Sequence, residues 1–197
     1  MHVHPGPFPV HAAGVFGNLN MKVKKAIPQD LPLLVEFTSE EAREAESSLK
    51  AFDNLKEGVR KALEDGSKAM YWLLADDSGE AVGSISALKE WSDWNAGFYW
   101  WIQSVYIVPA QRGKGYFDLL LEAVVEEMET QGGLELRLYV HEDNERAIGA
   151  YKKSAFEKLP YEIMALKSGR KPVAGNASLQ KTGRWRRRPH WTPVERK

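Results

Sequence analysis

Between positions 100 and 128 the chain changes from a strand-like to a helix-like pattern of hydrophobic residues. The segment from Trp100 to Val108 is almost entirely apolar and rich in aromatic and β-branched residues. This composition predicts a strand that is buried on both faces and ended by Pro109. From Gly115 onward, apolar residues recur at helical spacing with acidic residues between them. The apolar positions of this predicted helix are Phe117, Leu120, Leu121, Val124 and Met128.

The turn between the strand and the helix, residues 111–116, is basic and carries glycine at positions 113 and 115. Glycine adopts backbone conformations closed to other residues and lets the main chain approach a ligand closely. The first N–H groups of a helix have no partner within it and lie at the positive end of its dipole, so they bind a phosphate well. The turn therefore predicts an anion site, with a plain tight connection as the alternative.

Patterns elsewhere predict two helices and an antiparallel hairpin before this strand, and a strand, a helix and a strand after it. The predicted elements are a strand at 21–27, a helix with Asp30 as N-cap, a helix at 52–63, strands at 69–75 and 81–88 joined by a turn at 76–79, a loop at 89–97, a strand at 134–140, a helix after Asn144 and a last strand at 161–166.

The order of these elements and motifs resembles the GNAT superfamily of N-acetyltransferases. The loop from Arg112 to Gly115 is similar to the family pattern Q/R-x-x-G-x-G/A, with Phe117 in place of the final small residue. Residues 144–156 resemble the pattern N-x-x-A-x-x-x-Y-x-x-x-G-F, with Ala155 in place of glycine. The resemblance covers roughly residues 21–166. It implies a mixed α/β fold with a mostly antiparallel twisted sheet of six to seven strands and helices on both faces.

The resemblance also implies that acetyl-CoA is the acyl donor and that a primary amine of a small molecule or peptide attacks its thioester directly. Tyr151 is the expected proton donor to the departing thiolate, and a core tyrosine is the alternative. The implied donor-binding residues are Val105, Tyr106 and Ile107 for the pantetheine arm, Arg112, Gly113, Lys114, Gly115, Tyr116 and Phe117 for the pyrophosphate, and Asn144 for the arm.

Amine acetylation needs a base or a desolvating site. An alkyl ammonium with a pKa of about 10.4 lies roughly 4.6 kcal/mol from its reactive neutral form at pH 7. Glu90, or one of Glu40 and Glu41, can accept the proton directly or through water, and the sequence does not choose between them. Gln103 stands where similar enzymes often carry a glutamate base, and glutamine cannot take a proton.

The predicted acceptor-binding residues combine the acidic run with the tryptophans of the loop at 89–97. They are Glu40, Glu41, Trp91, Trp94 and Gln103. A solvated helix face is the alternative for the glutamates, and capping of a core edge is the alternative for the tryptophans.

Length and composition narrow the class of protein. A chain of 197 residues suits one domain with extensions, predicted here as a domain at 21–167 between a disordered leader at 1–20 and a basic disordered tail at 168–197. The absence of cysteine excludes disulfides, thiolate zinc sites and a thiol nucleophile. We predict no metal site. No apolar run approaches ~18 residues and no secretory signal is visible, so we expect a cytoplasmic protein without a membrane partner.

The net charge of zero conceals two oppositely charged parts. The tail holds nine Lys or Arg and one acidic residue, so the rest of the chain is equally acidic. An acidic body suits a cationic amine, although a solvated surface is the alternative. The tail binds nucleic acid only if it is functional. The sequence leaves a homodimer open.

Two other classes of function compete with acetyl transfer. A nucleotide-binding oxidoreductase is disfavoured, because only G-x-G is present and the glycine loop lies midway along the chain. A non-catalytic module that binds CoA, or that binds nucleic acid through the tail, is kept open by the glutamine at position 103.

Overall fold

The computed structural model describes residues 20–46 and 52–166. The chain divides into two compact units, Met1–Glu157 and Lys158–Lys197, and each is described by itself. Nearly all of the predicted leader and the whole predicted tail lie outside the described residues. All the elements of regular structure in the described residues belong to the first unit.

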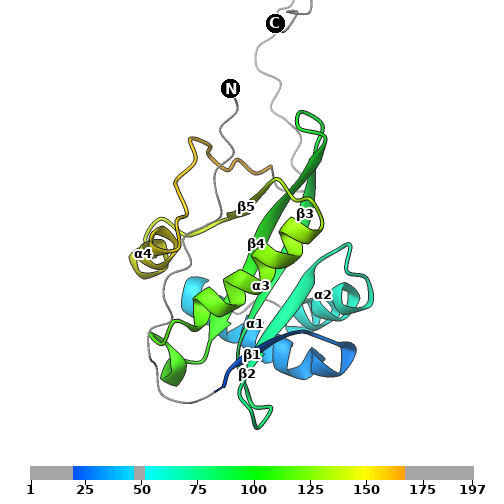
Figure 1. Ribbon diagram of the computed structural model, residues 1–197, viewed down its shortest axis with the longest axis vertical. Coiled ribbons are helices and arrows are strands. Elements are labelled where there is room, and N and C mark those ends of the chain that lie inside the picture. The colour runs from blue at the N-terminus through cyan, green and yellow to red at the C-terminus, as the bar shows by residue number, and fades with distance from the viewer. Residues whose placement is uncertain (1–19, 47–51, 167–197) are drawn as a thin grey trace, which may run out of the picture. The chain divides into compact units, whose positions relative to one another are not determined.

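A single five-stranded sheet, in the order β1-β2-β3-β4-β5, forms the centre of the first unit (Figure 1). Neighbouring strands are antiparallel except β4 and β5, which run parallel. The strands are β1 Lys22–Lys25, β2 Met70–Ala75, β3 Ala81–Ser92, β4 Gly97–Ile107 and β5 Glu135–Leu138. The predicted mixed α/β class with a mostly antiparallel sheet is confirmed.

Helices cover both faces of this sheet. The helices are α1 Leu31–Glu46, α2 Phe52–Glu64, α3 Tyr116–Thr130 and α4 Glu145–Lys153, with short 3-10 turns at Pro28–Asp30 and Pro109–Gln111. In Figure 1, α3 crosses one face in front of β4, and α1 lies on the other face. Among the described residues, no helix has the length and apolarity needed to span a membrane.

Each face of the sheet carries its own hydrophobic cluster. On the α3 face, Leu120 and Val124 pack with Trp100 of β4. On the α1 face, Leu34 and Phe37 pack with Tyr106 of β4. β4 therefore supplies buried side chains to both clusters. In its first half, the side chains on the α1 side are only partly buried.

The prediction of a loop at 89–97 is wrong, because β3 continues to Ser92. Its ladder with β4 extends through the pairs Lys89↔Trp100 and Trp91↔Phe98, so only residues 93–96 form the turn. The rings of Trp91 and Phe98 meet edge to face with centroids 5.0 Å apart. Cross-strand aromatic contacts of this kind stabilise a hairpin. The polar residues between the tryptophans suggested a loop and concealed this pairing.

The predicted last strand at 161–166 is also wrong. These residues form no strand in the second unit as far as it is described. Their large apolar side chains are exposed, with Met164 at 92% and Tyr161 at 79%. Within residues 20–46 and 52–166 the sheet therefore has five strands rather than six to seven. Alternating apolar residues after a proline can form a strand only where an edge pairs with them, and the pattern does not contain that information.

Asp30 does not cap α1 as predicted. It ends the 3-10 turn that precedes the helix, and its carboxylate accepts the N–H of Ile27 (2.9 Å). The same carboxylate pairs with Lys24 of β1 (3.0 Å). Asp30 thus connects β1 to the start of α1.

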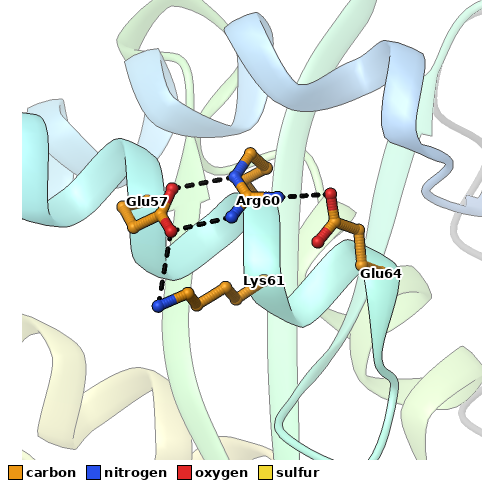
Figure 2. Close-up of polar contacts among 4 residues, drawn as sticks. All are labelled: Glu57, Arg60, Lys61 and Glu64. Atoms are coloured by element: carbon orange, nitrogen blue, oxygen red, sulfur yellow. Dashed lines mark hydrogen bonds and ion pairs between the residues drawn. The ribbon is translucent and has the colours of Figure 1, made fainter.

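The outer face of α2 carries an ion-pair network (Figure 2). Arg60 binds Glu57 (2.7 Å) and Glu64 (2.5 Å), and Lys61 lies 3.3 Å from Glu57. The hydrogen bond from Arg60 lowers the pKa of Glu57 to about 2. These exposed pairs keep one side of α2 polar, while Val59 on the other side is buried.

Gly83 allows β3 to approach β4 closely, and we expect Gly83→Ala to destabilise the fold. A Cβ at position 83 would lie 2.8 Å from the main-chain oxygen of Tyr106, which cannot move aside as a flexible side chain can. We expect a loss of about 1–3 kcal/mol in the free energy of unfolding, measured by denaturant titration. Gly58→Ala in α2 is the control: its Cβ meets nothing within 4 Å. That variant should gain about 0.5–1 kcal/mol. Equal effects of the two variants would contradict this account.

Candidate active site

A β-bulge at Gln103 reverses the alternation of side chains along β4. Ser104 pairs with Ser86 of β3 and Ile102 pairs with Ala87, so Gln103 has no partner on β3. Before the bulge, Trp100 and Ile102 face α3; after it, Tyr106 faces α1. The predicted strand was therefore located correctly, but its two halves contribute differently to the faces of the sheet.

The second half of β4 has an open main-chain edge. Its pairing with β5 ends at Ile102. On the other side, Val108 donates its N–H to the carbonyl of Val82 on β3 (2.9 Å). Because main-chain groups alternate between the two edges of a strand, the polar groups of Val105 and Ile107 point away from β3 toward the open edge. A ligand with amide groups can pair there.

The open edge leads directly into the glycine loop and the start of α3. Gly113 and Gly115 both have φ of +79°, a conformation that other residues rarely adopt, and Gly115 is the N-cap of α3. Within the described part of the chain, no protein acceptor is found for the main-chain N–H groups of residues 113–117. Unpaired donors at a helix start suit a phosphate.

Arg112 connects the glycine loop to other parts of the protein. Its Nε donates to the carbonyl of Ile107 (2.7 Å), and one of its terminal nitrogens lies 2.7 and 2.9 Å from the two carboxylate oxygens of Glu44 on α1. Its guanidinium also lies over the ring of Tyr106, 5.5 Å from the centroid. Arg112 thus connects the loop, the end of β4 and α1. Lys114 is exposed and donates to Gln111 (2.6 Å).

Glu41 of α1 reaches the open edge of β4. Its carboxylate accepts the N–H of Val105 (3.0 Å), the first open-edge donor after the bulge. Its neighbour Glu40 pairs instead with Arg43 along the helix. Of the acidic run predicted to border the acceptor, Glu41 and Glu44 therefore contact the site, one at each end of the open edge.

Tyr151 of α4 lies near the same place. Its ring packs edge to face on Phe117 of α3 (5.6 Å between centroids) and on Phe156 (5.8 Å). Burial raises the pKa of the Tyr151 hydroxyl, and the charge of Glu41 raises it further. Tyr151 therefore stays protonated at neutral pH, within electrostatic reach of Glu41. The packing contacts and the position beside Glu41 suit both a core tyrosine and a proton donor.

Polar groups line the α1 face of the sheet beneath Glu41. The hydroxyls of Ser86 and Ser104 lie 2.7 Å apart and are buried. Burial raises the pKa of the Tyr71 hydroxyl, and the charge of Glu41 raises it further. A hydrogen bond with Ser86 offsets part of this rise. The sequence analysis missed these residues, although serines within otherwise apolar strands are a signal that could have found them.

Several predicted site residues lie elsewhere. Trp91 is on the α3 face of the sheet, opposite Glu41, and Trp94 is 96% exposed in the turn. Glu90 accepts the indole N–H of Trp101 (2.5 Å). It pairs with Tyr99, six residues before Val105, so roughly 16–20 Å of strand separate Glu90 from the N–H bound by Glu41. The structure does not bring these three residues together with Glu41.

The remaining predicted residues lie at the bulge and at the starts of α3 and α4. Asn144 is the N-cap of α4, and its Oδ1 accepts the N–H of Ala147 (3.1 Å). Gln103 is exposed at the bulge. Tyr116 and Phe117 form the first turn of α3. The structure therefore groups the predicted donor-binding residues of β4, the glycine loop and α3 around one strand edge and one helix start.

The chain matches the sequence model of the family described as Acetyltransferase (GNAT) family over residues 33–156. This range extends from α1 to the end of the Tyr151 segment and so includes the bulge, the open edge and the glycine loop. Two curated relatives, the L-methionine sulfoximine/L-methionine sulfone acetyltransferases of Pseudomonas paraeruginosa and Pseudomonas aeruginosa, are each 31% identical over 111 residues. The match covers 55% of this chain and 57% of each relative.

Solved structures agree with this assignment. A possible acetyltransferase from Clostridium difficile 630 has a TM-score of 0.70 and 28% identity, over 76% of this chain and 98% of that one. A predicted acetyltransferase from Clostridium acetobutylicum, solved with acetyl-CoA, shares the fold with a TM-score of 0.63 and 18% identity, over 74% and 96% of the two chains. The chain therefore belongs to the GNAT acetyltransferase family.

Proposed function

We propose that this protein transfers an acetyl group from acetyl-CoA to the primary amine of a small molecule. One observation carries the proposal: the open edge at Val105 and Ile107 continues into a helix start whose first N–H groups lack protein acceptors. Acetyl-CoA combines amide groups in its arm with a pyrophosphate, and these match the strand edge and the helix start respectively. It supplies a thioester whose carbonyl carbon an amine can attack.

The residues of the chain divide the work of binding this donor. The carbonyl of Val105 and the N–H of Ile107 bind the arm, because Glu41 and Arg112 already contact the other main-chain groups of these two residues. The N–H groups of residues 113–117 bind the pyrophosphate. Arg112 acts chiefly as a positioning residue, because its contacts with Ile107 and Glu44 hold the loop against β4 and α1. Asn144 fixes the start of α4, which carries Tyr151.

Glu41 is the carboxylate that we propose as the general base. An acceptor enters as an ammonium and must lose a proton before it can attack. Among the glutamates considered, Glu41 reaches the open edge itself, whereas Glu40 pairs with Arg43 and Glu90 bonds to Trp101. Tyr151, held protonated by burial and by the charge of Glu41, donates a proton to the departing thiolate.

The curated relatives act on L-methionine sulfoximine and L-methionine sulfone, as their names state. They support a small-molecule amine as the acceptor here, and a peptide amine is the alternative. The chain spans little more than half the length of these relatives, so the acceptor does not transfer from them directly. A non-catalytic CoA-binding module is the competing function, and the position of Tyr151 within electrostatic reach of Glu41 favours catalysis.

Titration calorimetry with acetyl-CoA tests the donor site. We expect a micromolar dissociation constant, which the double variant Gly113→Ala, Gly115→Ala raises at least about tenfold. The cause is conformational, because φ of +79° costs a residue with a Cβ about 1–2 kcal/mol and nothing crowds the added methyl groups. Gly79→Ala is the matched control: it has φ of +85° in the β2–β3 turn and should leave binding unchanged. Absence of binding by the unchanged protein would refute the donor assignment.

Glu41→Gln should lower kcat by about 10²- to 10⁴-fold with little change in acetyl-CoA affinity. The amide oxygen of glutamine can still accept the N–H of Val105, but it cannot take a proton from an ammonium. The acidic limb of the kcat/KM profile should also disappear. Glu40→Gln serves as the control on the same helix turn. A kcat for Glu41→Gln within threefold of the unchanged protein would exclude the role of base.

Tyr151→Phe should retain acetyl-CoA affinity and melting temperature but lower kcat by about 10²- to 10⁴-fold. The variant keeps the ring contacts with Phe117 and Phe156 and removes only the hydroxyl. Because burial raises the pKa of this hydroxyl, the basic limb of the wild-type kcat profile should lie at higher pH than for an ordinary tyrosine, and it should flatten in the variant. A lower melting temperature with unchanged kcat would assign Tyr151 to the core instead.

A further inference from the structure

Four large side chains form a surface on the α1 face of the sheet, beside the proposed site. On β4, Tyr99 and Trp101 alternate with Trp100 and Ile102, which face α3. At β5, Arg137 and Tyr139 alternate with Leu136 and Leu138, which also face α3. The first pair named in each case therefore lies on the α1 face. We call Tyr99, Trp101, Arg137 and Tyr139 the aromatic shelf. In Figure 1, α3 crosses the opposite face of β4. None of the four belongs to a hydrophobic cluster found in the described residues.

Contacts among these side chains hold the aromatic shelf in place. Trp101 stacks on Tyr139 with centroids 4.5 Å apart and planes inclined by 21°. The guanidinium carbon of Arg137 lies 3.4 Å from the ring centroid of Tyr99 and 5.6 Å from that of Trp101. Tyr139 is nevertheless 62% exposed. The shelf is therefore an ordered aromatic surface that remains accessible.

The aromatic shelf lies within reach of the carboxylate proposed as the base. Trp101 precedes Val105 by four residues, one of them in the bulge, so roughly 10–13 Å of strand separate their main chains. Both the shelf and Glu41 lie on the α1 face, with the exposed Gln103 between them. One small molecule can lie on the shelf and bring its amine to Glu41.

The charges around the aromatic shelf favour a cation and disfavour a carboxylate. The guanidinium of Arg137 is already paired, because its Nε lies 2.8 Å from Glu135. One face of the same guanidinium stacks on the ring of Tyr99. On the opposite edge, the carboxylate of Glu90 accepts only the indole N–H of Trp101 among its contacts in the described residues. Glu41 adds negative charge at the far end. A carboxylate on the acceptor would thus meet like charges and a guanidinium that is already neutralised.

We infer that the acceptor is an arylalkylamine without a carboxylate, whose ring stacks on Trp101 and Tyr139 while its ammonium lies at Glu41. This inference rests on the proposed acetyl transfer and makes its acceptor specific. A flat ring fits a surface whose rings are already parallel, and ring stacking is stronger than the contact of a puckered aliphatic ring of similar size. The ammonium meets Glu41, and the absence of a carboxylate next to the amine avoids repulsion by Glu41.

Three acceptors that differ in one property each provide the test, with release of free CoA thiol as the measurement. 2-Phenylethylamine has the ring and the amine, 2-cyclohexylethylamine replaces the flat ring with a puckered one, and L-phenylalanine adds a carboxylate. We expect kcat/KM to be about three- to tenfold lower for the cyclohexyl amine. It should be at least about tenfold lower for phenylalanine.

Variants of the aromatic shelf locate the effect. Tyr139→Ala should raise the KM for 2-phenylethylamine about three- to tenfold, leave the KM for acetyl-CoA unchanged, and remove the preference over the cyclohexyl amine. Tyr139 is exposed, so this variant should keep its melting temperature, and Trp101→Leu repeats the test at the second ring. Trp94→Ala, at an exposed tryptophan away from the shelf, is the matched control and should change neither KM.

The outcomes separate this inference from the proposed function. If amines are acetylated but the cyclohexyl amine matches 2-phenylethylamine, or phenylalanine surpasses it, the shelf does not select the acceptor, while acetyl transfer stands. If Tyr139→Ala acetylates each of the three acceptors at the same rate as the unchanged protein does, the acceptor ring does not bind at the aromatic shelf. If acetyl-CoA does not bind and no amine is acetylated, the proposed function fails and the inference fails with it.

Discussion

The single extra residue in β4, Gln103, is the constraint on which the site depends. A strand paired on both edges along its whole length would have no main-chain groups to offer a ligand. The bulge reverses the alternation after Ile102, at the same point where pairing with β5 ends. Val105 and Ile107 consequently face an open edge, while Tyr106 between them anchors β4 to α1. Binding capacity and core packing are thus combined in three consecutive residues.

Helix α1 completes the open edge through its charges. Unsatisfied main-chain groups at a partly buried edge are costly, and here a carboxylate and a guanidinium satisfy two of them. Glu41 accepts the N–H of Val105, and Arg112, held by Glu44, donates to the carbonyl of Ile107. A helix whose sequence is typical of a solvated acidic face therefore supports the strand edge, and one of its carboxylates is the one that we propose as the base.

Sequence patterns predicted well the elements that carry the proposed donor site, because these elements are contiguous in the chain. The strand, the glycine loop and the start of α3 are contiguous, and glycine at positions 113 and 115 reflects a backbone conformation that the chain itself dictates. Partners distant in sequence were not visible. The ion pair of Arg112 with Glu44 was not predicted, because it requires α1 to lie against the loop. Likewise, Trp91 was placed beside the acceptor because its sheet face depends on how far β3 extends.

This contrast explains where specificity within such a fold can arise. A Cβ added to either loop glycine would meet nothing within 4 Å. Glycine is therefore required there by the backbone conformation and not by lack of space. The proposed donor site that the two glycines help to form suits any ligand with the same phosphate and amide groups. The aromatic shelf depends on side chains alone: Trp101 projects from β4, Arg137 projects from β5, and Tyr139 follows the end of β5. Replacing those side chains leaves the sheet intact, so the acceptor can change while donor binding is retained.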